Sequence, residues 1–189
     1  VGHWDATIDE ILNSGSVSQT WTLHVGESFG DVPTSHPFYA FVENLFHNGV
    51  TAGCGDATYC PDVPVTRAQM AVFLLKGERD SSYLPPACTS TVFSDVPCPG
   101  GAFVDWVNRL SSEGITAGCG GGRYCPNDPV NRGQMAVFLL KAEHGGGYAP
   151  PACAATVFDD VPCPGAQFVD WINQLVSEDI TAGCGGVDY

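Results

Sequence analysis

Basic residues are scarce in this chain of 189 residues. Seven lysines and arginines stand against 21 aspartates and glutamates, so the formal net charge is −14 at pH 7. An acidic surface of this kind repels phosphate backbones and anionic lipid headgroups. The composition therefore argues against nucleic acid and against an anionic membrane surface as partners.

The usual signs of catalysis and of metal binding are also absent from the sequence. The five histidines do not recur at one position of the repeat described below, and none lies in a motif for a serine- or cysteine-based triad. No acidic run matches the ligand series of an EF-hand. We therefore expect no enzyme activity, no cofactor and no metal site.

Long apolar runs are missing as well. None is long enough to cross a bilayer, so we expect no transmembrane segment. The sequence begins without an initiator methionine or a signal peptide. We interpret the chain as part of a larger secreted protein.

What the chain does contain is a long repeated unit, which is written nearly three times. Two motifs recur with it: F-x-D-V-P at Phe29, Phe93 and Phe158, and T-A-G-C-G at Thr51, Thr116 and Thr181. Units of this kind stack as similar modules. We divide the chain into residues 29–87 and 88–152, two complete repeats, and residues 153–189, an incomplete third. Residues 1–28 lie outside the repeat.

The non-repetitive start is predicted to be β-like. Residues 20–25 alternate between polar and apolar side chains in the manner of a strand, and Asn13–Ser16 is typical of a turn. The stretch from Trp4 to Leu12 fits both a helical face and a strand. We favour a hairpin from the end of a preceding β-sandwich domain.

Each repeat reads as helix, loop, helix. Phe103, Trp106, Val107 and Leu110 lie at i, i+3, i+4 and i+7, on one face of a helix, and Gly114 follows where a left-handed cap is expected. The same spacing begins at residues 38 and 168. A second helix, with the letters Q-M-A-V-F-L-L-K, begins after Pro129 in one copy and after residue 65 in the other. The predicted fold class is therefore mainly α.

Nine cysteines recur with the repeat. Eight of them fall in short, regularly placed pairs: Cys54 and Cys60, Cys88 and Cys98, Cys119 and Cys125, and Cys153 and Cys163. Such spacing favours disulfides in an oxidising, extracytoplasmic setting, since zinc sites usually use tighter C-x₂₋₄-C knuckles. Neighbouring pairs are the simplest connectivity, which the sequence leaves open. Cys184 is the odd one, because its counterpart would follow Tyr189.

One motif at the start of each second helix stands out. Thr66-x-x-Gln69 has the form of a capping box, and Asn131-x-x-Gln134 can act likewise. Capping leaves Arg67 and Arg132 unexplained, because a cation in the first turn opposes the helix dipole. Both arginines therefore predict a nearby anion.

That anion has two candidate sources, which the motif leaves equally open. One is internal: the aspartates of the F-x-D-V-P motifs, Asp31, Asp95 and Asp160, are available as partners. The other is a bound carboxylate or phosphate held by the guanidinium and the free N–H groups of the helix start. For the aspartates themselves we expect local hydrogen bonds that cap a turn or the first helix.

The ordered motifs resemble the S-layer homology domain over about residues 29–189. They are F-x-D-V-P, a first helix, G-[IV]-T-x-G, an aromatic residue followed by C-P, and V-T-R-A-Q before an apolar helix. This chain departs from the family pattern in three ways. The last motif ends with Gln instead of Glu, Asn131 and Gly133 replace Thr and Ala in the second copy, and the paired cysteines are unusual.

The resemblance implies tandem repeats packed as a pseudo-threefold bundle. It implies an anchor at the cell surface that binds an anionic envelope polysaccharide in grooves between repeats. The residues it places there belong to the arginine motif: Arg67, Arg132, Thr66, Asn131, Gln69 and Gln134. An alternative is a structural subunit of a surface layer or filament, in which the repeats and the N-terminal segment bind copies of the same chain.

Overall fold

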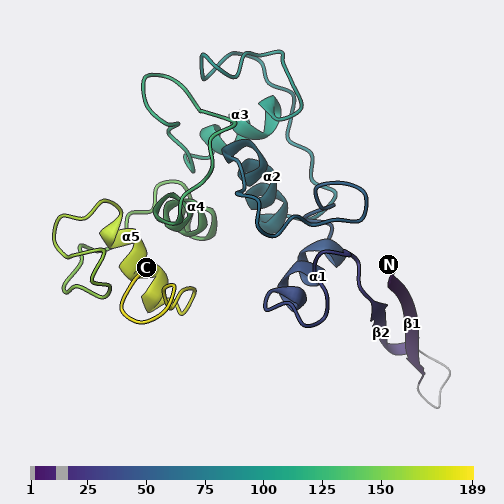
Figure 1. Cartoon of the computed structure of the whole chain (residues 1–189). Helices are drawn as coiled ribbons and strands as arrows, with labels where there is room; N and C mark the ends of the chain where they lie inside the picture. The colour runs from purple at the N-terminus through teal and green to yellow at the C-terminus, as the bar shows by residue number, and fades with distance from the viewer. Residues whose placement is uncertain (1–2, 12–16) are drawn as a thin grey trace. The chain divides into compact units, whose positions relative to one another are not determined.

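The computed structural model describes residues 3–11 and 17–189 and is mainly α, as predicted (Figure 1). A hairpin of β1 (His3–Ile11) and β2 (Val17–Gly26) precedes the helices. The helices are α1 (Tyr39–His47), α2 (Arg67–Glu78), α3 (Val104–Ser112), α4 (Arg132–His144) and α5 (Val169–Ser177). The chain forms two compact units, Val1–Val63 and Pro64–Tyr189, which are described separately below.

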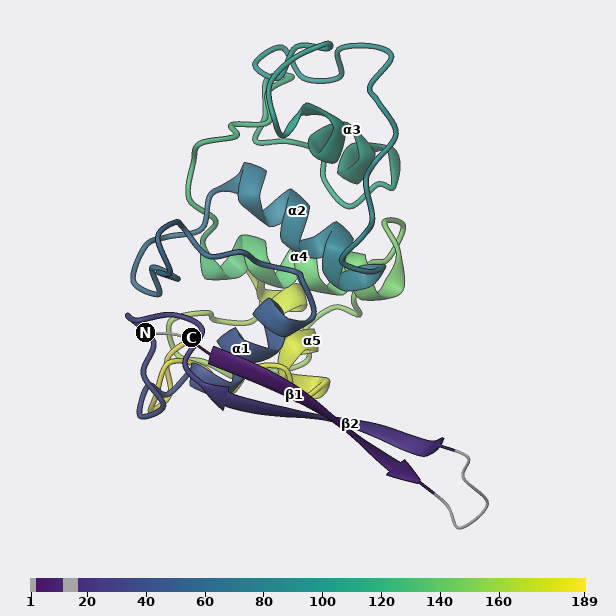
Figure 2. The ribbon, with the colours of Figure 1, turned by 90° about the vertical axis from the view of Figure 1, so that its right-hand side faces the viewer.

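The N-terminal hairpin is confirmed. β1 and β2 pair antiparallel, with Ile8 opposite Trp21 and an irregularity between Glu10 and Ile11 (Figure 2). Thr20 Oγ1 donates a hydrogen bond to Asp9 Oδ1 across the pair, at 2.6 Å. The ambiguous stretch is therefore a strand as far as Ile11. The predicted turn at residues 13–16 lies outside the described residues, and the origin of the hairpin in a β-sandwich remains a prediction.

The first helix of each repeat ends where the sequence indicated. Gly49 and Gly114 have φ of +64° and +74°, and Asp179 adopts +57° at the same place in the third copy. These are left-handed conformations that terminate a helix, and aspartate tolerates them better than most residues. In α3 and α5 most of the predicted apolar face is buried: Val107, Leu110, Ile172 and Leu175 are almost fully covered, while Phe103 at the start of the face is 40% exposed.

The second helix of one repeat packs on the first helix of the next. α2 packs against α3, α4 packs against α5, and α2 also contacts α4. We call α2 with residues 88–125 lobe 2, and α4 with residues 153–189 lobe 3. Residues 29–63, which include α1, are lobe 1. Each packed lobe thus combines the second half of one sequence repeat with the first half of the next.

Four disulfides join neighbouring cysteines, which confirms the predicted pairs and gives the connectivity that the sequence left open. Cys54–Cys60 and Cys119–Cys125 close the loop after a first helix, and Cys88–Cys98 and Cys153–Cys163 close the segment before one. Each pair has a Cα–Cα distance of 6.0 Å. Because these eight sulfurs are bonded in pairs, they do not form the rival zinc site. Cys184 has a free, exposed thiol.

Candidate functional site

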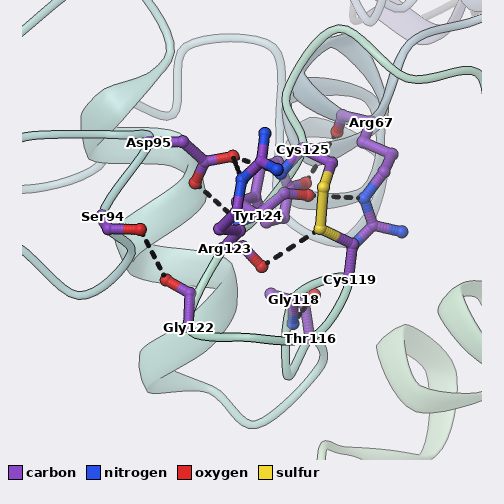
Figure 3. Close-up of a disulfide and its surroundings, with 10 residues drawn as sticks. All are labelled: Arg67, Ser94, Asp95, Thr116, Gly118, Cys119, Gly122, Arg123, Tyr124 and Cys125. Carbon is purple, nitrogen blue, oxygen red and sulfur yellow. Dashed lines mark hydrogen bonds and ion pairs between the residues drawn. A yellow bond between two sulfur atoms is a disulfide. The ribbon is translucent and has the colours of Figure 1, made fainter.

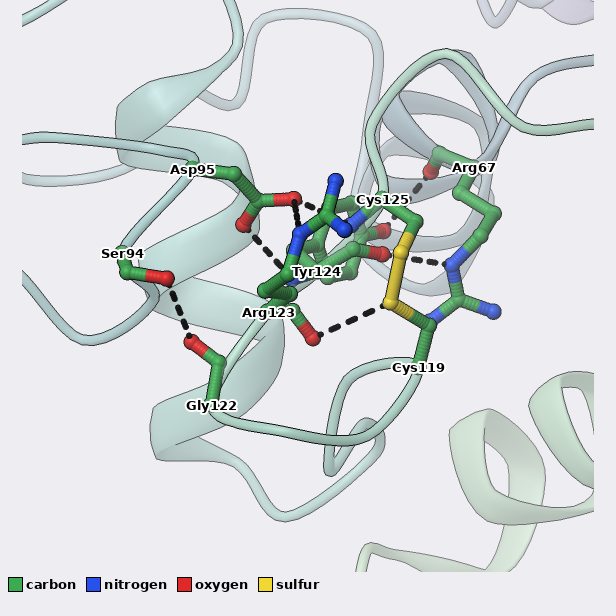
Figure 4. A network of polar contacts seen from close by, with 8 residues as sticks. All are labelled: Arg67, Ser94, Asp95, Cys119, Gly122, Arg123, Tyr124 and Cys125. Carbon is green, nitrogen blue, oxygen red and sulfur yellow. Dashed lines mark hydrogen bonds and ion pairs between the residues drawn. A yellow bond between two sulfur atoms is a disulfide. The ribbon is translucent and has the colours of Figure 1, made fainter.

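The aspartate of each F-x-D-V-P motif joins the start of its lobe to the loop that ends it. Asp95 accepts hydrogen bonds from the backbone N–H groups of Tyr124 and Cys125, both at 2.8 Å (Figure 4). Asp31 accepts the equivalent bonds from Tyr59 and Cys60 at 2.8 and 2.7 Å. The predicted role as a local cap is therefore wrong: these aspartates hold backbone that lies far along the chain.

The same contacts govern the ionisation of these carboxyl groups. Burial alone would raise the pKa of Asp95, but the N–H groups of Tyr124 and Cys125 outweigh it, with a smaller contribution from the charge of Arg123. The pKa of Asp95 consequently lies below its usual value. Burial would likewise raise the pKa of Asp31, but the N–H groups of Tyr59 and Cys60 lower it below its usual value. Both groups are acceptors at neutral pH.

The loop leaves no room for a side chain at its glycine. Gly118 has φ +88°, and a Cβ there would lie 2.3 Å from the carbonyl oxygen of Arg123 and 2.8 Å from the ring of Phe93. Its N–H donates to Thr116 Oγ1 at 3.1 Å. The T-x-G part of the motif therefore shapes a tight turn against the lobe core (Figure 3).

The helix-start motifs behave differently in the two copies. Thr66 and Gln69 form a complete capping box: Thr66 Oγ1 accepts from Gln69 N, and Gln69 Oε1 accepts from Thr66 N at 2.9 Å. Asn131 caps α4, since its Oδ1 accepts from Gln134 N at 2.8 Å. The expectation that Gln134 reaches back is wrong, because its Oε1 is buried without a hydrogen-bond partner.

Arg67 and Tyr124 hold one another across lobe 2. Arg67 Nε donates to the carbonyl oxygen of Tyr124 at 2.8 Å, and the Tyr124 hydroxyl donates to the carbonyl oxygen of Arg67 at 2.7 Å. The guanidinium carbon lies 4.9 Å from the centre of the Tyr124 ring and 5.3 Å from that of Phe138. Arg67 is only 3% exposed. Burial raises the pKa of Tyr124 to about 12, so its hydroxyl stays a donor.

Arg132 makes the equivalent contact in lobe 3. Its guanidinium carbon lies 4.5 Å from the centre of the Tyr189 ring, and the Tyr189 hydroxyl donates to the carbonyl oxygen of Arg132 at 3.3 Å. The two arginines therefore occupy related surroundings. They differ in exposure, because Phe138 of α4 covers Arg67 while Arg132 is exposed.

The aspartates are not the partners of these arginines. Among the described residues no carboxylate lies within ion-pair distance of Arg67 or Arg132, and Asp95 instead lies 3.6 Å from Arg123 Nε. One end of the Arg67 guanidinium, Nη2, is buried without any hydrogen-bond partner. In Figure 4 this side chain meets Tyr124 through Nε, and its outer end points away from that residue. A buried donor without a partner costs free energy, and more when it is charged.

Arg67 lines a cavity of about 300 Å³ between lobes 2 and 3. The other polar and aromatic residues that line it include Thr116, Gln134, Lys141, Gln167 and Phe168. The two unpaired atoms, Arg67 Nη2 and Gln134 Oε1, thus belong to side chains that line one cavity. The cavity has a cationic donor, an amide acceptor and an aromatic face.

A second cavity, of about 240 Å³, lies one repeat further along. It is lined by Asn131, Arg132, Met135, Thr181 and Tyr189, among others. Of the six predicted site residues, Arg67 and Gln134 line the first cavity, and Asn131 and Arg132 line the second. Thr66 and Gln69 line neither of these two cavities, and their side chains are engaged in the capping box.

Sequence reasoning missed Lys141 and Phe168. Lys141 Nζ donates to the carbonyl oxygens of Gly114 and Gly146, at 3.0 and 2.8 Å, and adds positive charge to the wall of the first cavity. A signal was available, since a lysine follows F-L-L in both second helices. Phe168 has φ +65° and lies where a Cβ on Gly133 would be 2.6 Å from its ring. Gly133, which departs from the family motif, makes room for it.

The fold and these cavities define a cystine-stabilised protein of tandem helix–loop–helix repeats, with one cationic cavity between lobes 2 and 3 and a second within lobe 3 at Arg132. The S-layer homology domain family matches residues 28–71 and 101–136. These two segments therefore match S-layer homology domains, as their motifs predicted, and such domains are cell-surface anchoring modules. The family and the disulfides together place the chain at the cell surface.

Two curated relatives each match about 60% of this chain. A cell surface protein of Thermoanaerobacter kivui is 33% identical over 116 residues, which is 60% of this chain and 15% of that protein. An endoglucanase of Bacillus sp. (strain KSM-635) is 28% identical over 121 residues, 60% of this chain and 11% of the enzyme. The chain thus matches only a small part of each relative. Among the described residues, no helix has the length and apolar character needed to cross a membrane.

Proposed function

We propose that the chain is a non-catalytic anchor that binds an anionic envelope polysaccharide in the grooves of Arg67 and Arg132. The observation that carries the proposal is the buried Nη2 of Arg67, which has no partner and belongs to a residue lining a cavity. A carboxylate or phosphate in that cavity would supply the missing acceptor. Hydrogen bonds between a guanidinium and an anion are among the strong ones.

The rest of the cavity suits a sugar better than a free inorganic anion. Gln134 Oε1 is an unpaired acceptor, and an acceptor binds a hydroxyl but not an anion. Phe168 offers an apolar ring surface in the same wall. An acidic sugar would suit all three groups: its acid group would bind Arg67, a hydroxyl group would donate to Gln134, and its ring would pack on Phe168.

The two grooves predict binding of a polymer through more than one site. They recur with the repeat, since Arg67 and Arg132 open equivalent helices and each stacks on the tyrosine of the next first-helix loop. Linked sites on one chain raise overall affinity through their effective concentration. Each groove can then bind the polymer weakly while the two grooves together bind it tightly.

The test is co-sedimentation of the 189-residue chain with purified envelope polysaccharide. Arg67→Gln and Arg132→Gln should each weaken binding, and the double variant should lose it. Arg123→Gln is the matched control, because Arg123 is exposed and lines neither of the two cavities. Circular dichroism must show that the variants keep the helical fold. Full retention by the folded double variant would defeat the arginine assignment.

A second candidate function is self-assembly of a surface layer or filament. It is favoured by the hairpin, since β1 and β2 pair only with each other among the described residues and leave an outer edge on each strand. Ile8 and Leu23 are exposed on that hairpin. Unpaired strand edges are templates for pairing with another chain. Light scattering that finds only monomer at every concentration would exclude this function for these residues.

A further inference from the structure

The second helices of lobes 2 and 3 end on different cationic residues. Arg79 directly follows α2, and His144, its counterpart one repeat later, is the last residue of α4. Each side chain reaches the glutamate that caps the end of the first helix packed on it, Glu113 after α3 or Glu178 after α5. We call these two contacts, Arg79–Glu113 in lobe 2 and His144–Glu178 in lobe 3, the latches.

The two latches have the same arrangement. In lobe 2, Arg79 donates a hydrogen bond to Glu113, and its guanidinium carbon lies 4.6 Å from the centre of the Tyr83 ring. In lobe 3, the imidazole Nε2 lies 2.9 Å from Glu178 Oε1, and the ring centre lies 4.4 Å from that of Tyr148. Each latch therefore joins the ends of two packed helices, with a linker tyrosine stacked on the cationic side chain.

The lobe 2 latch carries a charge that does not depend on pH in the physiological range, because a guanidinium stays protonated. It also has a second cation, since Arg109 Nε lies 2.5 Å from Glu113 Oε1. The counterpart of Arg109 in lobe 3 is Gln174, whose neutral amide donates to Glu178 Oε1 at 2.7 Å. Among the described residues, His144 is the one cationic side chain within ion-pair distance of Glu178.

The lobe 3 latch depends on a side chain that titrates. Histidine changes its charge between pH 5 and 8. His144 is the only histidine among residues 64–189. Its side chain is 35% exposed, so protons reach it without unfolding. The pKa of Glu178 lies below its usual value, because hydrogen bonds from Gln174 and, to a lesser degree, His144 outweigh its desolvation, and the carboxylate stays charged throughout this range.

The other ionisable groups near the lobe 3 latch do not replace the histidine. On α4, Lys141 donates to the carbonyl oxygens of Gly114 and Gly146, and Glu143 is exposed beside His144. The linker contributes the ring of Tyr148, which is neutral in this range. The charge of the imidazole is therefore what varies.

We propose that His144–Glu178 is a pH-sensitive latch, which holds α4 and α5 together when the imidazole is protonated and weakens when it is neutral. A protonated imidazole and a carboxylate form a charge-assisted hydrogen bond, which is stronger than one from a neutral donor. The added hold is fully present below the pH range in which histidine titrates, and it is lost as pH rises through that range. Lobe 2, with its arginine latch, keeps its hold throughout.

The latch adjoins the cavity at Arg132. Leu175 and Ile180, which flank Glu178 along the chain, line that cavity together with Tyr189. Loosening the end of α5 would therefore disturb the wall of this cavity, so binding there should weaken as pH rises. This consequence rests on the proposed function, whereas the latch itself does not.

The experiment measures amide hydrogen exchange by NMR at pH 5.5 and 8.0, without polysaccharide. The chain carries Cys184→Ser, so that its free thiol does not titrate. Protection factors remove the intrinsic effect of pH on exchange, and the α3 amides of the same sample serve as the internal control. We expect the protection of α5 relative to α3 to fall by about two- to fivefold between the two pH values, as for a partly exposed ion pair.

Two variants exchange the latches. His144→Arg gives lobe 3 the cation of lobe 2 and should abolish the fall in α5. The double variant Arg79→His and Arg109→Gln copies the lobe 3 latch into lobe 2, and it should add a fall of similar size to the α3 amides. Amide chemical shifts must show that each variant keeps the parent fold. The second variant tests the latch even where the first alters packing.

Three results would overturn the latch: an α5-to-α3 ratio equal at both pH values, a fall that survives His144→Arg, or α3 amides that do not respond to pH in the double variant. The consequence for the cavity is tested with the Arg67→Gln chain, whose polysaccharide binding should weaken from pH 5.5 to 8.0 unless His144→Arg is also present. Binding that is independent of pH would refute this consequence. No binding at either pH would refute the proposed function, while the exchange data would still decide the latch.

Discussion

Replacing Tyr124 with phenylalanine removes one hydroxyl from the centre of lobe 2 and leaves the ring in place. The hydroxyl is fully buried and donates to the carbonyl oxygen of Arg67 at 2.7 Å. A typical intramolecular hydrogen bond contributes about 1 kcal/mol to stability. At pH 7 we therefore expect the free energy of unfolding to fall by about 1 kcal/mol, and the Tm by roughly 2–4 °C for a chain of this size.

Alkaline pH should reverse this order of stability. The pKa of Tyr124 is raised from 10.0 to about 12 in the folded protein. A group whose pKa is raised by folding stabilises the protein fully below its unfolded pKa, and that stability is lost as pH rises through the folded pKa. At pH 11 the loss amounts to about 1.4 kcal/mol for the parent chain and none for the phenylalanine variant. The free energies of unfolding of the parent chain and of the phenylalanine variant should become equal near pH 11.

The assay is urea unfolding followed by circular dichroism at pH 7, 10 and 11. Both proteins should carry Cys184→Ser, because a free thiolate would exchange with the disulfides at high pH. Tyr189→Phe is the matched control: its hydroxyl makes the equivalent bond at 3.3 Å in an exposed setting, so it should cost below about 0.5 kcal/mol. Equal losses for the two variants at pH 7, or curves that stay parallel to pH 11, would refute the reasoning.

The remaining predictions concern the aspartate contacts, the groove and the disulfides. Asp95→Asn should cost about 1–3 kcal/mol in urea unfolding, because a carboxylate that accepts two N–H groups becomes an amide. Because its folded pKa is lowered, the parent chain should lose this contribution as pH falls below about 4, while the asparagine variant shows a weaker acid dependence. Gly133→Ala should push the Phe168 ring aside, lower the Tm and weaken polysaccharide binding, and an unchanged Tm would contradict the close contact. Replacing Cys88 and Cys98 by serine should cost about 2–3 kcal/mol by thermal melting, and reduction of the parent chain, which opens all four disulfides, should cost more.

The paired contacts of Arg67 and Tyr124 also link stability to the proposed function. Tyr124 contacts the same arginine that lines the groove, so its hydroxyl limits how far the Arg67 side chain can move. Interaction with a bound anion depends on that side chain being held in one geometry. Loss of the hydroxyl should therefore reduce polysaccharide binding more than the loss of the equivalent hydroxyl in lobe 3.

Local features of this protein could be predicted from the sequence because the groups involved are close along the chain. Helix faces repeat every three or four residues, a cap acts across three, and the disulfides close spans of six or ten residues. These patterns correctly indicated the helices, the left-handed end at Gly114, the cap at Thr66 and the hairpin. The ordered motifs of the repeat indicated the family.

Contacts over long separations were decided only by the tertiary structure. The repeat pattern alone makes Arg67 and Arg132 equivalent, yet one is buried and the other exposed, since α4 covers only the first. Asp95 appeared suited to a local turn, and it binds backbone of the distant Tyr124 and Cys125 instead. Local spacing does not record which helix a lobe will pack against. That choice follows from burying apolar faces together, which depends on the whole chain rather than on neighbours in sequence.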